Sequence, residues 1–279
     1  MLSADEIYEI LQAVKLKKPF YRLKNETFLT LDDEGISKFR LLENFNFTQK
    51  DIENGGKTLS KYHLLYLDAL KNIGVINTDD EFDEFVKKIR SIRANIPKHL
   101  KGVLRSYQKD GVNWLKQLSE LGFGGVLADD MGLGKTLEVI AFVMSEKRNL
   151  PVLVVAPSAL IYNWFNEINK FTPEANAVIV DGTVENRDMI LSDIRGFDFV
   201  ITSYALLRRD YDKYEKLEFS YMFIDESQHI KNYNTMNAKV VKKINAKKLK
   251  NVKIFPIIKY PPKVHLLTKL VIYIMLYFS

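Results

Sequence analysis

Apolar and polar residues follow two different rhythms along the chain, and the change comes near residue 100. In the first part, apolar positions recur every three or four residues, which predicts helices. These helices cover residues 4–16, 61–74 and 80–94, with one more beginning near Glu34. A strand pair with a turn at Asn25–Glu26 follows the first helix. Residues 1–96 are therefore predicted to form a small α+β module, which ends where Pro97 interrupts the helical pattern.

The second part is a succession of short apolar strands and helices. The predicted strands cover residues 125–128, 152–156, 177–180, 199–202 and 222–224. The predicted helices beside them cover residues 105–120, 137–147, 159–171, 185–194 and 204–208. Strands that alternate with helices in this way form a parallel sheet with helices on both faces. We therefore predict an α/β lobe with a mostly parallel sheet over residues 97–246.

Residues 247–279 break this pattern, because lysines, prolines and apolar residues follow one another there without a settled period. Residues 231–279 contain 11 lysines and no acidic residue, so the net charge of +6 comes entirely from this end. The charge is therefore no argument for nucleic-acid binding by the body of the protein. The apolar run at residues 270–279 is too short for a membrane span, which needs about 20 residues, and we predict no membrane association.

Two features bear on the compartment. The chain has no cysteine, which excludes disulfides and thiolate metal sites and fits a reducing cytoplasm. Its first ten residues are acidic and amphipathic, so we expect no secretion signal.

The stretch ADDMGLGKTLEVI, residues 128–140, follows a strand candidate and leads into a helix. A strand, a glycine-containing loop and a Lys-Thr pair at a helix start form the arrangement that cradles nucleotide phosphates. In it, Lys135 reaches the β- and γ-phosphates and the Thr136 hydroxyl ligates Mg²⁺. The strict pattern has Gly where this chain has Asp129. The residues therefore indicate a variant phosphate loop, with a plain surface turn as the alternative.

A second chemical feature is the pair Asp225-Glu226, which directly follows an apolar strand. The carboxyl ends of strands are where open α/β sheets bind ligands. Asp225 there can hold Mg²⁺ through water, opposite the Thr136 hydroxyl, and Glu226 can orient or deprotonate an attacking water. The alternative is an acidic pair that caps the next helix. A phosphate loop upstream in the same α/β unit favours the catalytic interpretation.

Five stretches resemble, in order and spacing, the sequential motifs of the Swi/Snf family. They are LRSYQKDGVNWL, GGVLADDMGLGKT, VLVVAPSALIYNW, FVITSYALL and FIDESQHIKN. The family consists of superfamily-two helicase-like ATPases that translocate on duplex DNA without separating its strands. The resemblance covers residues 100–245 and implies a RecA-like ATP-binding lobe. In YRLKNETFLTL and KYHLLYLDAL, the first part resembles the small domain that precedes the motor in bacterial members.

The resemblance also implies how the nucleotide is held. Gln108 matches the glutamine that reads the adenine edge, and Arg105 and Tyr107 shape that pocket. Asp129 fits the family's own form of the phosphate loop. The remaining residues that match nucleotide and Mg²⁺ contacts are Met131, Gly132, Leu133, Gly134, Lys135 and Thr136.

Catalytic and DNA-facing roles follow from the same resemblance. Asp225 and Glu226 match the metal-holding and water-activating acids. Gln228 stands where the family has His or Gln, which link the nucleotide to the DNA side. Ser158 and Thr202 match positions that meet the DNA phosphate backbone.

Several of these residues also have purely structural interpretations. Gln108 can be an exposed helix residue, Ser158 can be a helix N-cap, and Thr202-Ser203 can be a strand end with a cap. Trp114 and Trp164 lie at apolar helix positions and are expected in the core rather than under bases. A lysine cluster can follow a DNA backbone or form a solvated helix face. Its members are Lys239, Lys242, Lys243, Lys247, Lys248 and Lys250.

The resemblance stops near residue 247. The family continues into a strand ending in a Thr-Gly-Thr-Pro-like motif, and this sequence contains neither that motif nor a second RecA-like lobe with its arginine finger. We therefore expect an aberrant tail over residues 247–279, and hypothesise out-of-frame translation of a truncated gene. The sheet would then lack its last strand and expose an edge. Without the second lobe's cation, which contributes ~10³–10⁵ in rate, ATP hydrolysis is expected to be very slow or absent.

The sequence thus predicts the N-terminal part of an ATP-dependent DNA translocase that uses ATP and Mg²⁺. The implied partners are duplex DNA, DNA-bound proteins and the missing second lobe, in the nucleoid of a bacterial cytoplasm. The alternative is a non-catalytic nucleotide- or DNA-binding fragment. A stand-alone P-loop kinase is disfavoured by Gln108 ahead of the loop and by the DESQH stretch.

Overall fold

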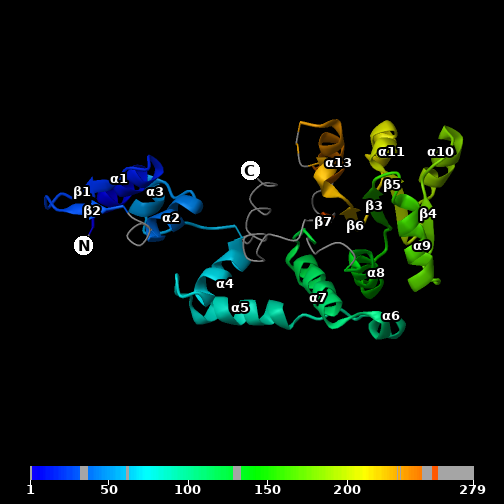
Figure 1. Cartoon of the computed structure of the whole chain (residues 1–279), viewed down its shortest axis with the longest axis horizontal. Coiled ribbons are helices and arrows are strands. Elements are labelled where there is room, and N and C mark those ends of the chain that lie inside the picture. The colour runs from blue at the N-terminus through cyan, green and yellow to red at the C-terminus, as the bar shows by residue number, and fades with distance from the viewer. Residues whose placement is uncertain are drawn as a thin grey trace. The chain divides into compact units, whose positions relative to one another are not determined.

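The computed structural model describes residues 2–31, 37–60, 63–127, 133–230, 232, 234–246 and 253–256. The chain forms two compact units, Met1–Val86 and Lys87–Ser279 (Figure 1). The division between them lies within helix α5 (Asp80–Ser91), before the module boundary predicted at residue 96. Within the described part of the chain, no helix combines the length and the apolar character that crossing a bilayer requires.

The first unit contains the predicted strand pair and helices. Its elements are α1 (Ala4–Lys15), β1 (Phe20–Arg22), β2 (Phe28–Thr30), α2 (Ser37–Asn44), α3 (Gln49–Glu53) and α4 (Leu64–Asn72). Strands β1 and β2 pair antiparallel, and Glu26 in the turn between them has a φ of +66°. Ile10, Val14 and Leu31 form a small core between α1 and this strand pair. The structure therefore confirms the predicted strand pair, whereas α3 was missed because it is only five residues long.

The second unit is built on a parallel five-stranded sheet with the order β4-β5-β3-β6-β7. Its strands are β3 (Val152–Ala156), β4 (Ala177–Ile179), β5 (Phe199–Ser203), β6 (Tyr221–Ile224) and β7 (Lys253–Pro256). Every residue of β3, β5 and β6 is buried, as expected of strands covered on both faces. The structure thus confirms the predicted α/β fold and its parallel strands.

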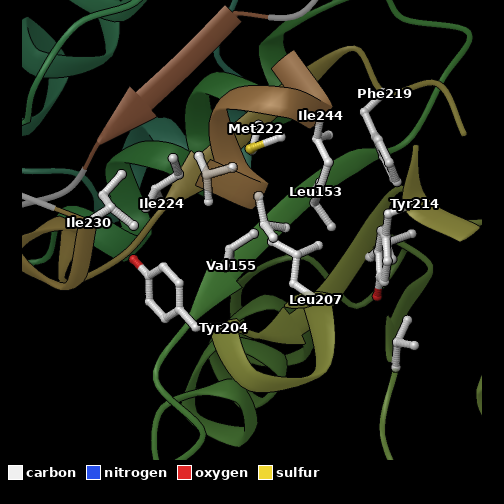
Figure 2. Close-up of a cluster of buried hydrophobic side chains, with 14 of the residues drawn as sticks. Leu153, Val155, Tyr204, Leu207, Tyr214, Phe219, Met222, Ile224, Ile230 and Ile244 are labelled. Carbon is white, nitrogen blue, oxygen red and sulfur yellow. The ribbon is translucent and has the colours of Figure 1, made fainter. Parts of the chain in front are cut away.

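Helices cover both faces of this sheet. On one face, α8 (Lys135–Ser145) places the Phe142 ring 5.1 Å from the ring of Tyr221, and α7 (Ser106–Leu121) packs on α8. Helix α9 (Ile161–Phe171) lies beside α8. On the other face, α11 (Tyr204–Arg209) and α13 (Met236–Ala246) bury residues such as Leu207 and Ile244 against the strands (Figure 2). The remaining elements are α6 (Lys98–Val103), α10 (Val184–Ser192), α12 (Tyr211–Tyr214) and η2 (Ser227–Ile230).

Three local predictions were wrong. Residues 125–127 do not form a strand, and Leu127 makes only an isolated bridge. Helix α9 begins after Leu160, which has no side-chain cap, so Ser158 is not its N-cap. The sheet does not lack its last strand, because β7 pairs parallel with β6 and places Lys253 opposite Tyr221. Local patterns missed β7 because its apolar residues lie among lysines and prolines, where no period is visible.

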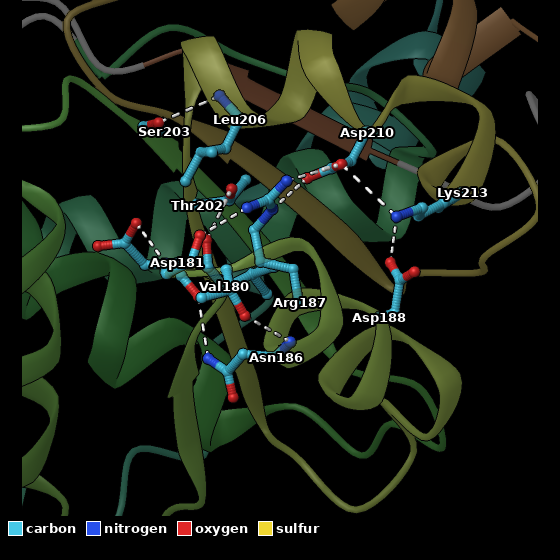
Figure 3. A network of polar contacts seen from close by, with 12 residues as sticks. Val180, Asp181, Asn186, Arg187, Asp188, Thr202, Ser203, Leu206, Asp210 and Lys213 are labelled. Atoms are coloured by element: carbon cyan, nitrogen blue, oxygen red, sulfur yellow. Dashed lines mark hydrogen bonds and ion pairs between the residues drawn. The ribbon is translucent and has the colours of Figure 1, made fainter.

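A buried ion pair fastens α10 to the segment between α11 and α12 (Figure 3). Arg187 donates to both carboxylate oxygens of Asp210, at 2.6 and 3.2 Å, and to the carbonyl of Gly182 at 2.6 Å. Burial by itself raises the pKa of Asp210, but the Arg187 hydrogen bonds and the positive charges of Arg187, Lys213 and Arg209 together outweigh it and hold that pKa below its usual value. Lys213 bonds Asp188 at the exposed margin of this cluster. The pair stabilises the outer helices beside β4 and β5.

Candidate nucleotide-binding site

The site lies at the carboxyl edge of the sheet, where the direction of strand addition reverses. After β3, the chain adds β5 and β4 on one side, and it then crosses to add β6 and β7 on the other. Ligands of open α/β sheets bind at such a switch point. The residues that follow β3 and β6, among them Ser158 and Asp225, therefore lie at the same edge of the sheet.

Helix α8 begins at this edge with the Lys-Thr pair. Gly134 is its N-cap, with a φ of +79° that favours glycine, and Lys135 is its first residue. Lys135 is buried and Thr136 is half-buried. The N–H groups and the dipole at the start of a helix favour an anion such as phosphate. The predicted loop residues Asp129, Met131 and Gly132 lie outside the described residues.

Gln108 connects the first turn of α7 to Leu133, which lies in the predicted phosphate loop. Its Oε1 accepts from the Arg105 backbone N–H at 2.9 Å, and its Nε2 donates to the Leu133 carbonyl at 2.9 Å. The Tyr107 hydroxyl donates to the same carbonyl at 3.1 Å. Gln108 is only 5 % exposed, so its interpretation as an exposed helix residue was wrong. Its amide retains a second hydrogen and a second lone pair, and adenine recognition stays a prediction.

Asp225 is held by hydrogen bonds from several elements. Its backbone N–H donates to the Val155 carbonyl at 2.8 Å, and its carbonyl accepts from the Tyr204 hydroxyl at 2.6 Å. Its Oδ2 accepts from the Trp164 indole at 2.9 Å, and its Oδ1 accepts from the Glu226 N–H at 2.8 Å. The carboxylate is thus held in one orientation in a buried position.

Sequence reasoning missed the role of Trp164, although it placed this residue correctly. The side chain is 2 % exposed, which confirms the predicted core position. A buried indole N–H needs an acceptor, and this requirement is the signal that could have pointed to a polar partner. Trp114, the other tryptophan, is half-buried on α7.

Glu226 has an unusual backbone conformation. Its φ is +49°, which a non-glycine side chain adopts only at a cost in energy, and such strain is concentrated at functional sites. The side chain is buried, and its Oε2 accepts from Gln228 Nε2 at 2.5 Å. Glu226 directly precedes the 3₁₀ turn η2, and Gln228 lies within this turn with its side chain exposed. Glu226 therefore stands at the sheet edge, next to Asp225, with its carboxylate bonded to Gln228.

Glu167 is a further acidic residue of the site that the sequence did not single out. It is half-buried on α9, and its carboxylate accepts a hydrogen bond from the Thr136 hydroxyl. Burial raises its pKa, and the nearby Asp225 carboxylate adds to this rise, while Lys170 and the Thr136 hydroxyl oppose it. Glu167 thus lies close to both predicted Mg²⁺ ligands. Its spacing of three residues from Trp164 is the only trace of this role in the sequence.

The oxygen atoms gathered here suit Mg²⁺. Thr136 supplies a hydroxyl and Asp225 a carboxylate, and hard oxygen donors of this kind are the ones that Mg²⁺ prefers. Among the described residues, no group of three or more His, Cys, Asp or Glu side chains could hold a metal by itself. Mg²⁺ that accompanies a nucleotide takes most of its ligands from phosphate and water, and it needs only one or two protein oxygens. The donor set therefore fits a Mg²⁺–nucleotide complex.

The two residues predicted to contact DNA differ in exposure. Ser158 is exposed in the turn after β3. Thr202 is completely buried, with its hydroxyl 3.5 Å from the Val180 carbonyl (Figure 3). Ser203 accepts from the Leu206 N–H and caps α11, which confirms the interpretation of Thr202-Ser203 as a strand end with a cap. A contact of Ser158 with DNA stays a prediction, whereas the Thr202 hydroxyl already has an internal partner.

The lysines of α13 lie on its outer face. Lys239, Lys242 and Lys243 are exposed, while Ala238 and Val241 between them are buried. This arrangement confirms a solvated helix face, and its contact with DNA stays a prediction. Lys247, Lys248 and Lys250 lie outside the described residues.

Comparison with known proteins agrees with this geometry. Residues 107–275 match the family model of the SNF2-related domain, and residues 2–97 match that of the bacterial SNF2 helicase-associated domain. The first match extends well into the segment after residue 247. Neither this match nor strand β7 supports the hypothesis that the segment is translated out of frame.

Individual relatives match different shares of the chain. The putative ATP-dependent helicase/translocase YwqA of Bacillus subtilis is 30% identical over 84% of this chain and 26% of its own length. The ISWI chromatin-remodeling complex ATPase ISW1 of Saccharomyces cerevisiae is 40% identical over 54% of this chain and 14% of its own length. The chain thus spans at most about a quarter of the length of these relatives.

A solved structure supports the fold assignment. The Sulfolobus solfataricus SWI2/SNF2 ATPase core in complex with dsDNA matches 62% of this chain and 35% of its own, with 35% identity and a TM-score of 0.51. Because one family model covers more than half of the sequence, the chain belongs to the SNF2-related family, and its first part belongs to the bacterial SNF2 helicase-associated domain.

Proposed function

We propose that this chain supplies the first nucleotide-binding lobe of a bacterial ATP-dependent translocase on duplex DNA. The observation that carries the proposal is the convergence of the α8 start with Asp225 at one edge of the sheet. Glu167 bonds Thr136 and lies near Asp225, which supports one site for the predicted phosphate loop and the predicted metal-holding acid. The family match over residues 107–275 supports the same function.

Each residue has a role that follows from its chemistry. Lys135 offsets the charge of the β- and γ-phosphates, and the α8 start donates N–H groups to them. Thr136 and Asp225 would hold Mg²⁺, which offsets charge that develops on the transferred phosphoryl group. Glu226 would orient the attacking water or accept its proton. Gln108 holds Leu133 against α7, and its amide has a second N–H and a second oxygen lone pair for the adenine edge.

Duplex DNA is the proposed partner. The support is the family itself and the similar solved core, whose title names dsDNA. Ser158, exposed after β3, is the residue of this lobe that we propose to meet the DNA phosphates. DNA-bound proteins that the motor displaces are proposed as further partners, and we place the protein at the bacterial nucleoid.

We expect these 279 residues, tested by themselves, to bind nucleotide but to turn it over very slowly. The proposed mechanism needs a cation that approaches the γ-phosphate from a second lobe, and such a cation contributes ~10³–10⁵ in rate. No second RecA-like motif set is present in the sequence printed here.

The test measures ADP binding by calorimetry and ATP turnover with and without duplex DNA, in the wild type and in Lys135→Ala. Lys147→Ala is the matched control, because Lys147 is exposed just beyond the end of α8. Nucleotide binding that is lost only in Lys135→Ala supports the proposal. DNA-stimulated turnover by the wild type would contradict the expected low activity, and the absence of any nucleotide binding would overturn the proposal.

A further inference from the structure

Helix α9 presents two polar groups on one face, one turn apart, toward the predicted metal ligands. Trp164 donates its indole N–H to Asp225 Oδ2 at 2.9 Å, and both residues are buried. Three residues later, Glu167 accepts from the Thr136 hydroxyl. Residues at i and i+3 lie next to each other on a helix surface. Helix α9 thus contacts both Asp225, after β6, and Thr136, at the start of α8.

Both contacts bear directly on the predicted metal ligands. The Asp225 carboxylate receives the indole at Oδ2 and the Glu226 N–H at Oδ1. The Thr136 hydroxyl donates its hydrogen to Glu167, which turns the oxygen of Thr136 away from Glu167 as a donor and leaves it to act as an acceptor. Partners that orient metal ligands in this way raise metal affinity, and their mutation typically lowers it about 10–100-fold.

We propose that Trp164 and Glu167 are positioning residues, which hold Asp225 and Thr136 in the orientation that a Mg²⁺–nucleotide complex requires. The inference rests on the proposed nucleotide site and adds to it two residues that make no contact with nucleotide themselves. It explains why a tryptophan, rather than an aliphatic residue, occupies this buried position. An aliphatic side chain would fill the volume and leave Asp225 Oδ2 without its donor.

The first experiment is a Mg²⁺ titration of ADP binding to the full chain. Trp164→Phe removes the N–H and keeps an aromatic ring, and Trp114→Phe is the matched control on α7. We expect Trp164→Phe to raise the Mg²⁺ concentration for half-maximal binding about tenfold or more, with ADP binding in EDTA unchanged. Trp114→Phe should leave the Mg²⁺ midpoint as in the wild type.

The second experiment tests Glu167 and its neighbour. Glu167→Ala removes the acceptor of the Thr136 hydroxyl, whereas Asn166→Ala alters an exposed position of the same helix. Only the Glu167 variant should shift the Mg²⁺ midpoint. Equal midpoints for the two variants would remove Glu167 from the proposal.

A double-mutant cycle separates positioning from mere packing. Asp225→Asn keeps an acceptor for the indole but weakens the metal ligand. If Trp164 acts through Asp225, the shifts in Mg²⁺ midpoint caused by Trp164→Phe and Asp225→Asn will not add in the double variant. Additive shifts, or no shift in folded Trp164→Phe, would overturn the role of Trp164.

If Trp164→Phe does not fold, the fluorescence of Trp164 itself tests the proposal without a change at the site. The chain has two tryptophans, so Trp114→Phe leaves Trp164 as the sole indole fluorophore. Its emission should change when Mg²⁺ is added to the ADP-bound protein, and an unchanged emission at saturation contradicts the proposal. Failure of the wild type to bind ADP, with or without Mg²⁺, is a different result, because it overturns the nucleotide site itself.

Discussion

At the residue scale, Gly134 at the end of the predicted phosphate loop lies close to Gln108 of α7. Gly134 has a φ of +79°, and a Cβ there would lie 2.4 Å from Gln108 Nε2. Gln108 is bonded at both ends of its amide and is buried, so it has little room to move. The close approach of backbone and amide therefore needs a residue without a side chain.

Gly134→Ala should destabilise the protein and weaken nucleotide binding. The left-handed conformation costs an alanine roughly 1–2 kcal/mol, and displacement of Gln108 adds to this cost. Gly122→Ala is the matched control, because its φ is +77° and nothing lies within 4 Å of its added Cβ. Thermal unfolding and ADP calorimetry of both variants measure the difference. Equal losses of stability and unchanged ADP affinity in the two variants would show that the contact with Gln108 is unimportant.

Asp210→Ala should be strongly destabilising, because it leaves the Arg187 guanidinium buried without its carboxylate. Removal of one partner from a buried ion pair costs ~3–5 kcal/mol. Asp188→Ala, which removes the exposed partner of Lys213, should change stability little. Urea unfolding of the two variants makes the comparison, and similar midpoints would contradict the role given to the Arg187–Asp210 pair.

At the element scale, helix α3 depends on a capping box. The Thr48 hydroxyl accepts from the Asp51 N–H, and the Asp51 carboxylate accepts from the Thr48 N–H at 2.8 Å and from Lys57 at 3.1 Å. The Thr48 backbone N–H is the largest of the contributions that lower the pKa of Asp51 to about 2. A five-residue helix without this cap would have few other interactions to hold it.

The stability that Asp51 contributes should therefore depend on pH. Because its pKa is lowered in the folded state, the contribution is present above the ordinary carboxyl value near 4 and is lost as pH falls toward 2. Asp51→Asn should lower the melting temperature at pH 7 by a few degrees. At pH 2 the variant and the wild type should approach each other. A difference in melting temperature that stays constant across this range would refute the assignment.

At the scale of the whole molecule, every described residue of the candidate site belongs to the second compact unit. The site residues with assigned contacts, from Arg105 to Gln228, all follow Lys87. A nucleotide that binds only the folded state at 100 times its Kd stabilises what it binds by about 2.7 kcal/mol. This stabilisation is expected in the second unit alone.

Hydrogen exchange can locate the effect. Mg²⁺ and ADP should increase protection in α7, in the start of α8 and around Asp225, and should leave residues 2–31 unchanged. The Lys135→Ala variant serves as the control, in which neither region changes. Protection of residues 2–31 by nucleotide would mean that the first unit takes part in the site.

The local pattern of the sequence was sufficient for most elements and for choosing the candidate residues of the site. Strands β3, β5 and β6 are short apolar runs between helices, and their burial on both faces leaves no other assignment. The Lys-Thr pair and the Asp-Glu pair could be recognised as candidates from their spacing and their position after apolar runs alone. Strand β7 could not be found in this way, because only its pairing with β6 distinguishes it from the surrounding lysines and prolines.

By itself, the sequence determined the α/β class, the parallel sheet and the residue types proposed to bind phosphate and Mg²⁺, because these depend on periodicity and on side-chain chemistry. Tertiary structure alone decided that Trp164 bonds Asp225, that Glu167 bonds Thr136 and that Gln108 is buried against the loop. It also decided that Ser158 caps no helix and that Thr202 is buried. The physical reason is that such contacts join residues distant in sequence, whose meeting depends on the order of strands and the packing of helices rather than on any local pattern.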